Sequence, residues 1–518
     1  MNGTGTPETG FPAVRHRLAF GVDEYMSFLR AIGAAPLIMV PFVTSRPIDA
    51  ADWVEYMNAP AGVAGNPNGG VDWADVRADN GHPRPYEVRR WEIGNEQDHP
   101  TERYWMAAND AKAVKQYAFG GERTIVAEPL GRNCAHPLHG VAADGSADQH
   151  FEVLYPPVKA ASVKVLVGGT GWDRVADLSS SGPRDRVFRV RAASGTIVFG
   201  DGVHGAVPPA GASVTASYTS VHAGFFSFAR RMKAVDPHIR VCSSWGTPAF
   251  VVLARGRHDD CLTTHPITTF GGSRGHPAHW SRPLVGHDAF MQAAERRRRQ
   301  VVRLLDVLPS RTPLWLTEAS TIHGDTDTFP SWATSASHAA YMASLWADWM
   351  NLRIPWGMGD DLLWTNDRAV LGPAPDYAFT ADAVTRQALR PMFEAGGKVL
   401  ATSVENNPVR RPRSGSSYAA LAVCATRRKR RMFVMVVNRL PTTDVTARIR
   451  FDGARVAGRM SVRRVAGSSF QSWNPPGEAP SVRLVRRSRS VHGFSFEAGF
   501  PAASTTVFRI RVASGGRD

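Results

Sequence analysis

The chain has 518 residues, 43% of them hydrophobic and 21% charged, which is ordinary for a soluble globular protein of two or three domains. No apolar run approaches the ~20 residues that a membrane-spanning helix needs, so we expect no membrane partner. The formal net charge of +15 excludes a strongly acidic surface and raises the possibility of an acidic partner, either nucleic acid or an acidic polysaccharide.

The excess charge comes mainly from runs of arginine. Residues 427–431 (RRKRR) separate two apolar runs, YAALAVCA and MFVMVVN, as the tip of a β-hairpin would. No aromatic residues interleave with the arginines, although a single-strand nucleic-acid binder would need them. We therefore favour solvated helix and hairpin faces over a binding surface, and we expect no nucleic-acid partner.

The four cysteines, Cys134, Cys242, Cys261 and Cys424, are widely scattered. They form no CxxC pair and no spacing typical of metal ligands. We interpret them as free or incidental, and we expect no metal site.

The first part of the chain alternates between helical and strand patterns. Helical spacing covers residues 23–32 and 52–58, and short apolar strands cover 37–43 and 87–94. A strand that is apolar throughout is typical of a sheet covered on both faces. Such alternation predicts a parallel sheet or barrel.

The alternation breaks between about residues 150 and 218. Short strands such as VKVLVGG, DRVFRVR and SVTASYTS are divided there by Gly, Pro and Asp. This pattern predicts a small all-β module inserted in the larger fold. Its stretch FGDGVHGAVPPAG resembles a β module of phage-baseplate-type assembly proteins.

The alternation then resumes and finally gives way to strands alone. Helices are predicted at 223–234, 288–308 and 335–350, and strands at 240–244, 261–265, 313–317 and 360–364. From about residue 397 the pattern is β only, as in a sandwich. The expected domains are a first part of a catalytic barrel (1–149), the β insert (150–222), a second barrel part (223–396) and a C-terminal β-sandwich (397–518).

Two predicted strands end in a glutamate at the point where the run of apolar residues stops. One is WEIGNE, which ends in Glu96, and the other is LWLTEAS, which contains Glu318. In a (β/α)8 barrel the residues at the C-terminal ends of the strands face the active site, and a pair of carboxylates across a cleft is what glycoside hydrolysis requires. The alternative is a glutamate that complements the dipole of a following helix. Asn95 speaks against that alternative for Glu96, because Asn is a poor strand residue.

WEIGNE with a later strand-end glutamate resembles the clan A retaining glycoside hydrolases, and most closely the α-L-arabinofuranosidase family. The stretches FGVDEYMSFLRAIGAAPLIMVPF, DWVEYMNAP and QYAFGG resemble that family as well. The resemblance implies a (β/α)8 TIM barrel with an accessory sandwich, a retaining mechanism and no cofactor.

By the same resemblance, Glu96 is the general acid/base and Glu318 the nucleophile. Asn95 would hydrogen-bond the 2-hydroxyl of the sugar, and His265 would line the pocket. Trp364 is a candidate apolar platform for a sugar face, with core packing as the alternative. The expected substrate is an oligo- or polysaccharide.

Several departures keep the substrate open. Pro266 and Ile267 follow His265 where the family usually has an aromatic residue. The sequence Thr-Glu-Ala-Ser around Glu318 is nearer to that of families that act on glucuronides or xylosides. The leading expectation is an α-L-arabinofuranosidase, and the alternative is a related glycosidase for uronides or xylosides. A rival of another class is a non-catalytic carbohydrate-binding or assembly protein. The oligomeric state stays open.

The N-terminal region contains too few strand-like segments for a complete barrel. Only one clear strand precedes the strand of Glu96, where three are needed. We therefore expect an N-terminally incomplete barrel of six strands, caused by a start codon assigned too late. We also expect this chain to be expressed poorly and to have little activity. No signal peptide is visible. The localisation would be extracellular if a leader precedes this sequence, and cytoplasmic otherwise.

Overall fold

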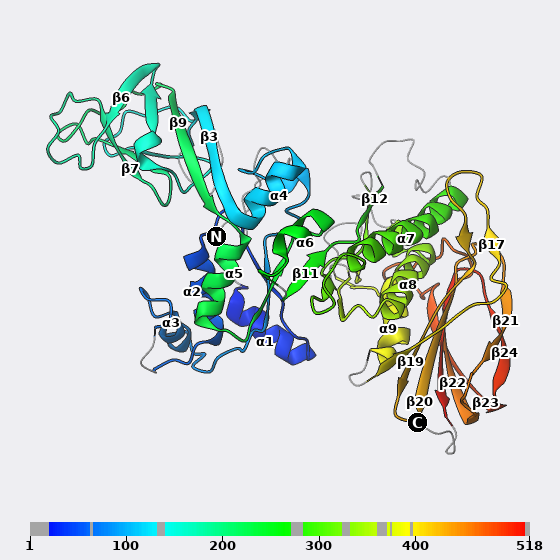
Figure 1. The fold of residues 1–518 in the computed structure, drawn as a ribbon. Helices are drawn as coiled ribbons and strands as arrows, with labels where there is room; N and C mark the ends of the chain where they lie inside the picture. Colours follow the sequence, from blue (N-terminus) through cyan, green and yellow to red (C-terminus); the bar gives the residue numbers. More distant parts are fainter. Residues whose placement is uncertain are drawn as a thin grey trace. The chain divides into compact units, whose positions relative to one another are not determined.

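A computed structural model describes residues 20–62, 66–131, 140–258, 260–270, 283–323, 332–359, 370–372, 375–393 and 397–512 (Figure 1). The chain divides into two compact units. The first comprises residues 1–263 with 309–312, and the second comprises residues 264–308 with 313–518.

Parallel strands form the centre of the first unit. Their order is β1 (Ile38–Val40), β2 (Arg90–Ile93), β10 (Arg240–Ser243) and β11 (Cys261–Thr264). Nearly all residues of β2, β10 and β11 are buried, as expected for strands covered on both faces. All four strands were predicted, although each is shorter than its apolar run.

Helices accompany these strands along the chain. They are α1 (Val22–Ile32), α2 (Pro47–Asn58), α3 (Trp73–Asp79), α4 (Asp110–Phe119), α5 (Phe225–Val235) and α6 (Pro248–Ala254), with 3₁₀ turns at Pro100–Glu102 and Ala160–Ser162. Helix α1 ends as predicted at Gly33, whose left-handed φ of 68° closes the last turn. Proline at the first position of α2 places its start before the predicted residue 52.

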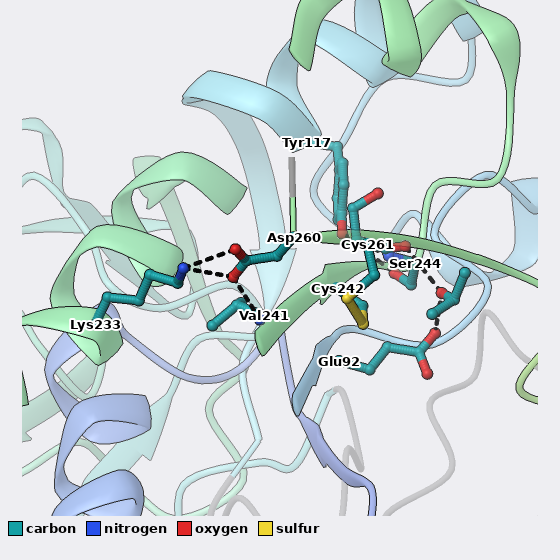
Figure 2. The surroundings of a disulfide bond; sticks show 10 residues. Glu92, Tyr117, Lys233, Val241, Cys242, Ser244, Asp260 and Cys261 are labelled. Carbon is teal, nitrogen blue, oxygen red and sulfur yellow. Dashed lines mark hydrogen bonds and ion pairs between the residues drawn. A yellow bond between two sulfur atoms is a disulfide. The ribbon is translucent and has the colours of Figure 1, made fainter. Parts of the chain in front are cut away.

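A disulfide joins Cys242 of β10 to Cys261 of β11 (Figure 2). The expectation that these two cysteines are free was therefore wrong. They are direct partners in the parallel register, and their Cα atoms lie 4.6 Å apart. Parallel pairing brings residues 19 positions apart into contact, which cysteine spacing alone does not reveal. Cys424 is free and buried, as expected, and Cys134 lies outside the described residues.

The inserted module forms its own seven-stranded sheet. The order is β3 (Gly120–Pro129), β9 (Val214–Ala223), β5 (Lys164–Val167), β6 (Thr170–Arg174), β7 (Val187–Arg191), β8 (Thr196–Phe199) and β4 (His150–Glu152). Its strands begin at Gly120, before the expected residue 150, because β3 pairs antiparallel with β9 along its length. The four-part domain division otherwise stays a prediction.

The two ends of the module meet at a narrow neck. Gly120 lies opposite Ala223 in the β3–β9 ladder (Figure 1). A Cβ atom on Gly120 would lie 2.3 Å from the carbonyl oxygen of His222, and one on Gly224 would lie 2.1 Å from the nitrogen of Gly120. Only glycine permits this approach of the two backbones, so the crossing depends on both residues.

The second unit contains a further parallel pair of barrel type, β13 (Leu314–Leu316) and β15 (Trp356–Gly357). The described residues thus include six such parallel strands, the number predicted. The last of them is β15, which was not predicted, and the predicted strand 360–364 lies outside the described residues and stays a prediction. The helices of this unit are α7 (Pro283–Leu305), α8 (Ala336–Asn351) and α9 (Ala381–Leu389), with 3₁₀ turns at Trp332–Thr334 and Arg390–Met392.

The β region after residue 397 is a sandwich, as predicted. Its main sheet has the order β16 (Lys398–Leu400), β19 (Leu421–Arg428), β20 (Arg431–Asn438), β25 (Ser504–Arg511), β22 (Val456–Ala466) and β23 (Arg483–Gly493). Two smaller pairs accompany it: β17 (Val409–Arg410) with β18 (Tyr418–Ala419), and β21 (Val445–Arg450) with β24 (Ser495–Phe500). Strands β19 and β20 form a hairpin whose turn lies in RRKRR, which confirms that prediction.

Buried polar contacts fix the sandwich to the helices of its own unit. Asp288 of α7 accepts bonds from Arg410, at 2.5 and 2.8 Å, and from the Tyr418 hydroxyl at 2.6 Å. The fully buried His287 bonds Ser337 of α8 and the carbonyl oxygen of Arg439. Buried groups paired in this way hold one arrangement of helices and sheet. Among the helices that the structure describes, none is long and apolar enough to cross a membrane.

Candidate active site

In the first unit, the candidate residues follow the C-terminal end of β2. The backbone turns at Gly94, whose φ is 81° and whose N–H donates to the Val40 carbonyl of β1. A Cβ atom there would lie 2.6 Å from Gln97 and 3.0 Å from both Phe42 and Ser244. Glycine is therefore required between the strand and the residues that follow it.

Glu96 itself has a left-handed backbone, with φ at 49°. This conformation is costly for a residue with a side chain, and such residues cluster at functional sites. The Glu96 side chain is half-buried. Burial is the main cause that raises the pKa of the neighbouring Glu102, and the negative charge of Glu96 raises this pKa further. The nearby carboxyl groups thus lie in a partly desolvated environment.

Asn95 presents a buried acceptor that has no protein partner. Its Oδ1 atom is buried and makes no hydrogen bond within the described part of the chain. Its backbone carbonyl accepts a bond of 2.9 Å from Gln97, which is itself buried. Because a buried polar atom without a partner is costly, the amide of Asn95 is suited to a polar ligand.

The end of β2 is held by two hydroxyl groups. The carbonyl oxygen of Ile93 accepts bonds from Tyr117 of α4, at 2.8 Å, and from Ser244, at 2.7 Å. The Tyr117 hydroxyl in turn accepts the Ser244 N–H at 2.9 Å (Figure 2). Burial raises the pKa of Tyr117, so its proton stays available as a donor. These bonds fix the strand end from which Asn95 and Glu96 project.

Glu92 is a buried carboxyl group that sequence reasoning missed. It lies inside β2, is fully buried and accepts a hydrogen bond from Thr263 (Figure 2). The same Thr263 hydroxyl also lies 2.8 Å from the Ser243 carbonyl oxygen, so its single proton is shared between these two acceptors. The available signal was a carboxyl group inside an otherwise apolar strand core, because a glutamate is almost never fully buried without a partner.

In the second unit, His265 and Glu318 lie together. Glu318 follows β13 and is 38% exposed, while the His265 side chain is only 6% exposed. Nδ1 of His265 is 3.9 Å from a carboxylate oxygen of Glu318, and its Nε2 is 3.0 Å from the Thr317 hydroxyl. The imidazole is therefore held by the Thr317 hydroxyl and faces the Glu318 carboxylate. Thr317 was not singled out from the sequence.

The segments beyond these two residues also pair. Strand β12 (Thr268–Phe270), which follows His265, runs parallel to β14 (Thr321–His323), which follows Glu318. The N–H of Thr268 donates to the Ser320 carbonyl at 3.0 Å. This pairing holds the two candidate side chains in register. Trp364 lies outside the described residues, so its predicted role stays a prediction.

The family described as the alpha-L-arabinofuranosidase 1 domain matches residues 7–119, a stretch that contains Asn95 and Glu96. An intracellular exo-alpha-(1->5)-L-arabinofuranosidase of Streptomyces lividans is 36% identical over 107 residues, which are 19% of this chain and 15% of that protein. An extracellular exo-alpha-L-arabinofuranosidase of Streptomyces chartreusis is 35% identical over 98 residues, 16% of this chain and 11% of that protein. The chain thus matches only a small part of the length of these curated relatives.

Solved structures resemble the chain over almost all of its length. The α-L-arabinofuranosidase of Thermotoga maritima has a TM-score of 0.61 at 16% identity, covering 98% of this chain and 83% of that one. The GH51 arabinofuranosidase of Xanthomonas axonopodis pv. citri has a TM-score of 0.62 at 14% identity, covering 98% and 84%. Residues 7–119 are thus similar in sequence to the alpha-L-arabinofuranosidase 1 domain, and the chain shares with these solved structures the fold of a (β/α)8 barrel with a C-terminal β-sandwich.

Proposed function

We propose that the protein is a retaining glycoside hydrolase that cleaves an α-L-arabinofuranoside in an oligo- or polysaccharide. The Glu318 carboxylate attacks the anomeric carbon, while the carboxylic acid of Glu96 donates its proton to the departing glycosidic oxygen. Glu96 then takes a proton from a water molecule. The oxygen of this water attacks the anomeric carbon, and the bond from the sugar to Glu318 breaks. Two displacements retain the configuration, and they require the two carboxyl groups to be about 5–5.5 Å apart.

The observation that carries this proposal is the end of β2. Gly94 is sterically required, Asn95 offers a buried acceptor, and Glu96 has a strained backbone. All three lie in the stretch that matches the arabinofuranosidase domain. A rigid strand end that projects a carboxyl group and an amide is suited to a sugar with several hydroxyl groups.

His265 supports the role of Glu318 as nucleophile. Its imidazole, held by Thr317, lies 3.9 Å from the Glu318 carboxylate. A cationic or donor group at that place favours the ionised carboxylate, which is the attacking form. A nucleophile must stay ionised while the acid keeps its proton, so the two environments have to differ.

A uronide or xyloside is the second candidate substrate. Thr-Glu-Ala-Ser around Glu318 departs from the arabinofuranosidase pattern, and the match to the arabinofuranosidase domain, residues 7–119, does not include Glu318. A non-catalytic carbohydrate-binding protein is the rival of another class.

A panel of 4-nitrophenyl glycosides tests the proposal. We expect nitrophenol release from the α-L-arabinofuranoside and at most slow release from the β-xyloside and β-glucuronide, with the first-formed sugar retaining its anomeric configuration by proton NMR. Preference for the glucuronide or xyloside would select the second candidate. No turnover of any glycoside, by a folded protein that still binds arabinan, would favour the non-catalytic rival.

A further inference from the structure

A basic hollow of about 910 Å³ lies on the main sheet of the C-terminal sandwich. Its lining residues belong to the end of β19, the β19–β20 turn, β20, β22, β23 and β25. Six arginines and one lysine line it, and no Asp or Glu does so in the part of the chain that the structure describes. The volume is within the range of small-ligand sites. We define this as the sandwich hollow.

The strand register places cations directly against one another in the sandwich hollow. Arg431 of β20 is the direct partner of Arg511 on β25, and Arg509 lies two residues away on the same strand. All three are exposed. Like charges directly opposite each other destabilise a strand pair, so a protein gains nothing in folding from this arrangement. An anion from outside the chain would offset the repulsion.

Other arginines of the same unit do have carboxylate partners. Arg439 pairs with Glu295 at 2.8 Å, and Arg410 pairs with Asp288 at 2.5 Å. Arg459 in the sandwich hollow instead donates to the neutral hydroxyl of Ser488 at 2.7 Å. That bond orients the guanidinium but leaves its positive charge. Arg459 therefore differs from Arg410 and Arg439, whose charges are balanced by carboxylates of the same unit.

The chemistry of the hollow favours carboxylates on a sugar polymer. Guanidinium groups match carboxylates with two parallel hydrogen bonds, and arginine outnumbers lysine here by six to one. Ser461 and Ser488, direct partners on β22 and β23, add hydroxyl groups suited to sugar hydroxyls. Phe433, the aromatic residue of the lining, is buried and offers no face on which a nucleic-acid base would stack.

We propose that the sandwich hollow binds an acidic polysaccharide through the carboxylates of its uronic-acid units. This inference rests in part on the proposed function, because a glycosidase gains from being held on the polymer that carries its substrate. It also revises the interpretation of the RRKRR run as a merely solvated hairpin tip. That run and β25 together supply most of the basic residues that line the hollow.

Binding of the full chain to polygalacturonate tests the proposal, by affinity electrophoresis and by calorimetry in low salt. We expect binding that weakens steeply with added salt. The double variant Arg509→Glu/Arg511→Glu should lose at least tenfold in affinity. Arg184→Glu/Arg186→Glu, at two exposed arginines of the inserted module, changes the net charge equally and should bind as the wild type does. Circular dichroism checks that both variants are folded.

The outcomes separate this inference from the proposed function. Binding is measured without turnover, and hydrolysis of a nitrophenyl glycoside should be the same in both double variants. Equal loss of affinity in the two variants would mean diffuse attraction by net charge and would overturn the proposal. Tighter binding of single-stranded DNA than of polygalacturonate at the same salt would overturn it in favour of a nucleic-acid site. Absence of polygalacturonate binding by the wild type would also overturn it.

Discussion

Glu318, the proposed nucleophile, is the residue whose removal has the most specific consequence. Without its carboxylate no glycosyl-enzyme forms, so Glu318→Ala should reduce turnover of a nitrophenyl glycoside to background. The cavity left by the side chain admits azide, which attacks the anomeric carbon directly. We expect a glycosyl azide of inverted configuration, identified by NMR.

The matched variant is Glu96→Ala. It keeps the nucleophile and loses the proton donor, so a poor leaving group should suffer a loss of about 10²–10⁴-fold. Azide should then yield a product of retained configuration, because it replaces water in the second displacement. Identical azide products from both variants would contradict the assigned roles.

Asn95 should contribute to binding the sugar through its buried amide. Its Oδ1 has no protein partner within the described residues, so a substrate hydroxyl would satisfy an atom that is otherwise costly to bury. We expect Asn95→Ala to lower kcat/KM by about 100-fold on the ordinary substrate, by analogy with the loss of one transition-state hydrogen bond. The same variant should matter little for a 2-deoxy substrate. Asn80→Ala, on an exposed helix cap, is the control. An equal loss on both substrates would assign Asn95 a structural role.

At the scale of elements, the disulfide of β10 and β11 is the most direct target. It closes a loop across a sequence separation of 19 residues, and loops of this length are typically stabilised by about 3 kcal/mol. Cys242→Ala/Cys261→Ala should lower the free energy of unfolding by about that amount. Dithiothreitol should lower the midpoint of urea unfolding of the wild type and leave that of the variant unchanged. Cys424→Ala separates this effect from that of a free thiol. A wild type insensitive to the reductant would show that the bond does not stabilise the protein.

The neck of the inserted module makes a deletion testable. Removing residues 120–223 would bring Phe119 next to Gly224, two residues whose backbones already approach each other closely. We expect a soluble protein that retains activity on a small nitrophenyl substrate. One cost is foreseen, because Trp105 stacks on His222 at 4.3 Å and would lose that cover. Trp105→Gln in the shortened chain should restore solubility if exposure of that ring is the cause of aggregation. Loss of folding in both shortened chains would make the module part of the core.

Local pattern located most of the strands and failed where pairing is distant. Apolar runs predicted β1, β2, β10, β11 and β13, which are largely buried on both faces, with the exception of β1, whose Met39 is exposed. Strand β3 was missed, because its partner β9 lies some ninety residues further along the chain and because the sequence of β3 is largely polar. The disulfide was missed for the same reason.

Part of the candidate site was likewise visible in the sequence. Strand-end position singled out Glu96, Glu318 and His265, and the structure brings His265 and Glu318 together within one unit. Thr317 and Glu92 were missed, because their relevance comes from contacts with other strands. Their catalytic roles stay predictions for the experiments above.

On the scale of the whole molecule, buried histidines govern the response of stability to acid. Burial lowers the pKa of His222, His287 and His338 to about 4. In the unfolded chain each titrates near its ordinary value of about 6.5. Between these values the unfolded state binds protons that the folded state does not, so stability is fully present above about pH 6.5 and is lost as the pH falls toward 4.

Asp348 acts in the opposite direction. Burial raises its pKa to about 7, against the partial compensation of Arg298 at 3.3 Å. Over the same range the folded protein therefore binds one proton that the unfolded chain does not, which stabilises it as the pH falls. Three histidines against one aspartate leave a net difference of about two protons near pH 5, or about 2–3 kcal/mol per pH unit at most.

We therefore expect the free energy of unfolding, measured by urea titration, to decrease from pH 6.5 to pH 4.5. His338→Phe should flatten this decrease by about one proton, because neither ring nitrogen of His338 has a hydrogen-bond partner among the described residues. Asp348→Asn should steepen it, because that variant removes the proton that Asp348 binds in the folded state. His222 belongs to the first unit and the other three groups to the second, where two histidines oppose one aspartate, so a tryptophan signal that reports the units separately should show a net dependence of about one proton in each. Stability that is flat or rising toward pH 4.5 in the wild type would contradict burial as the dominant influence on these histidines.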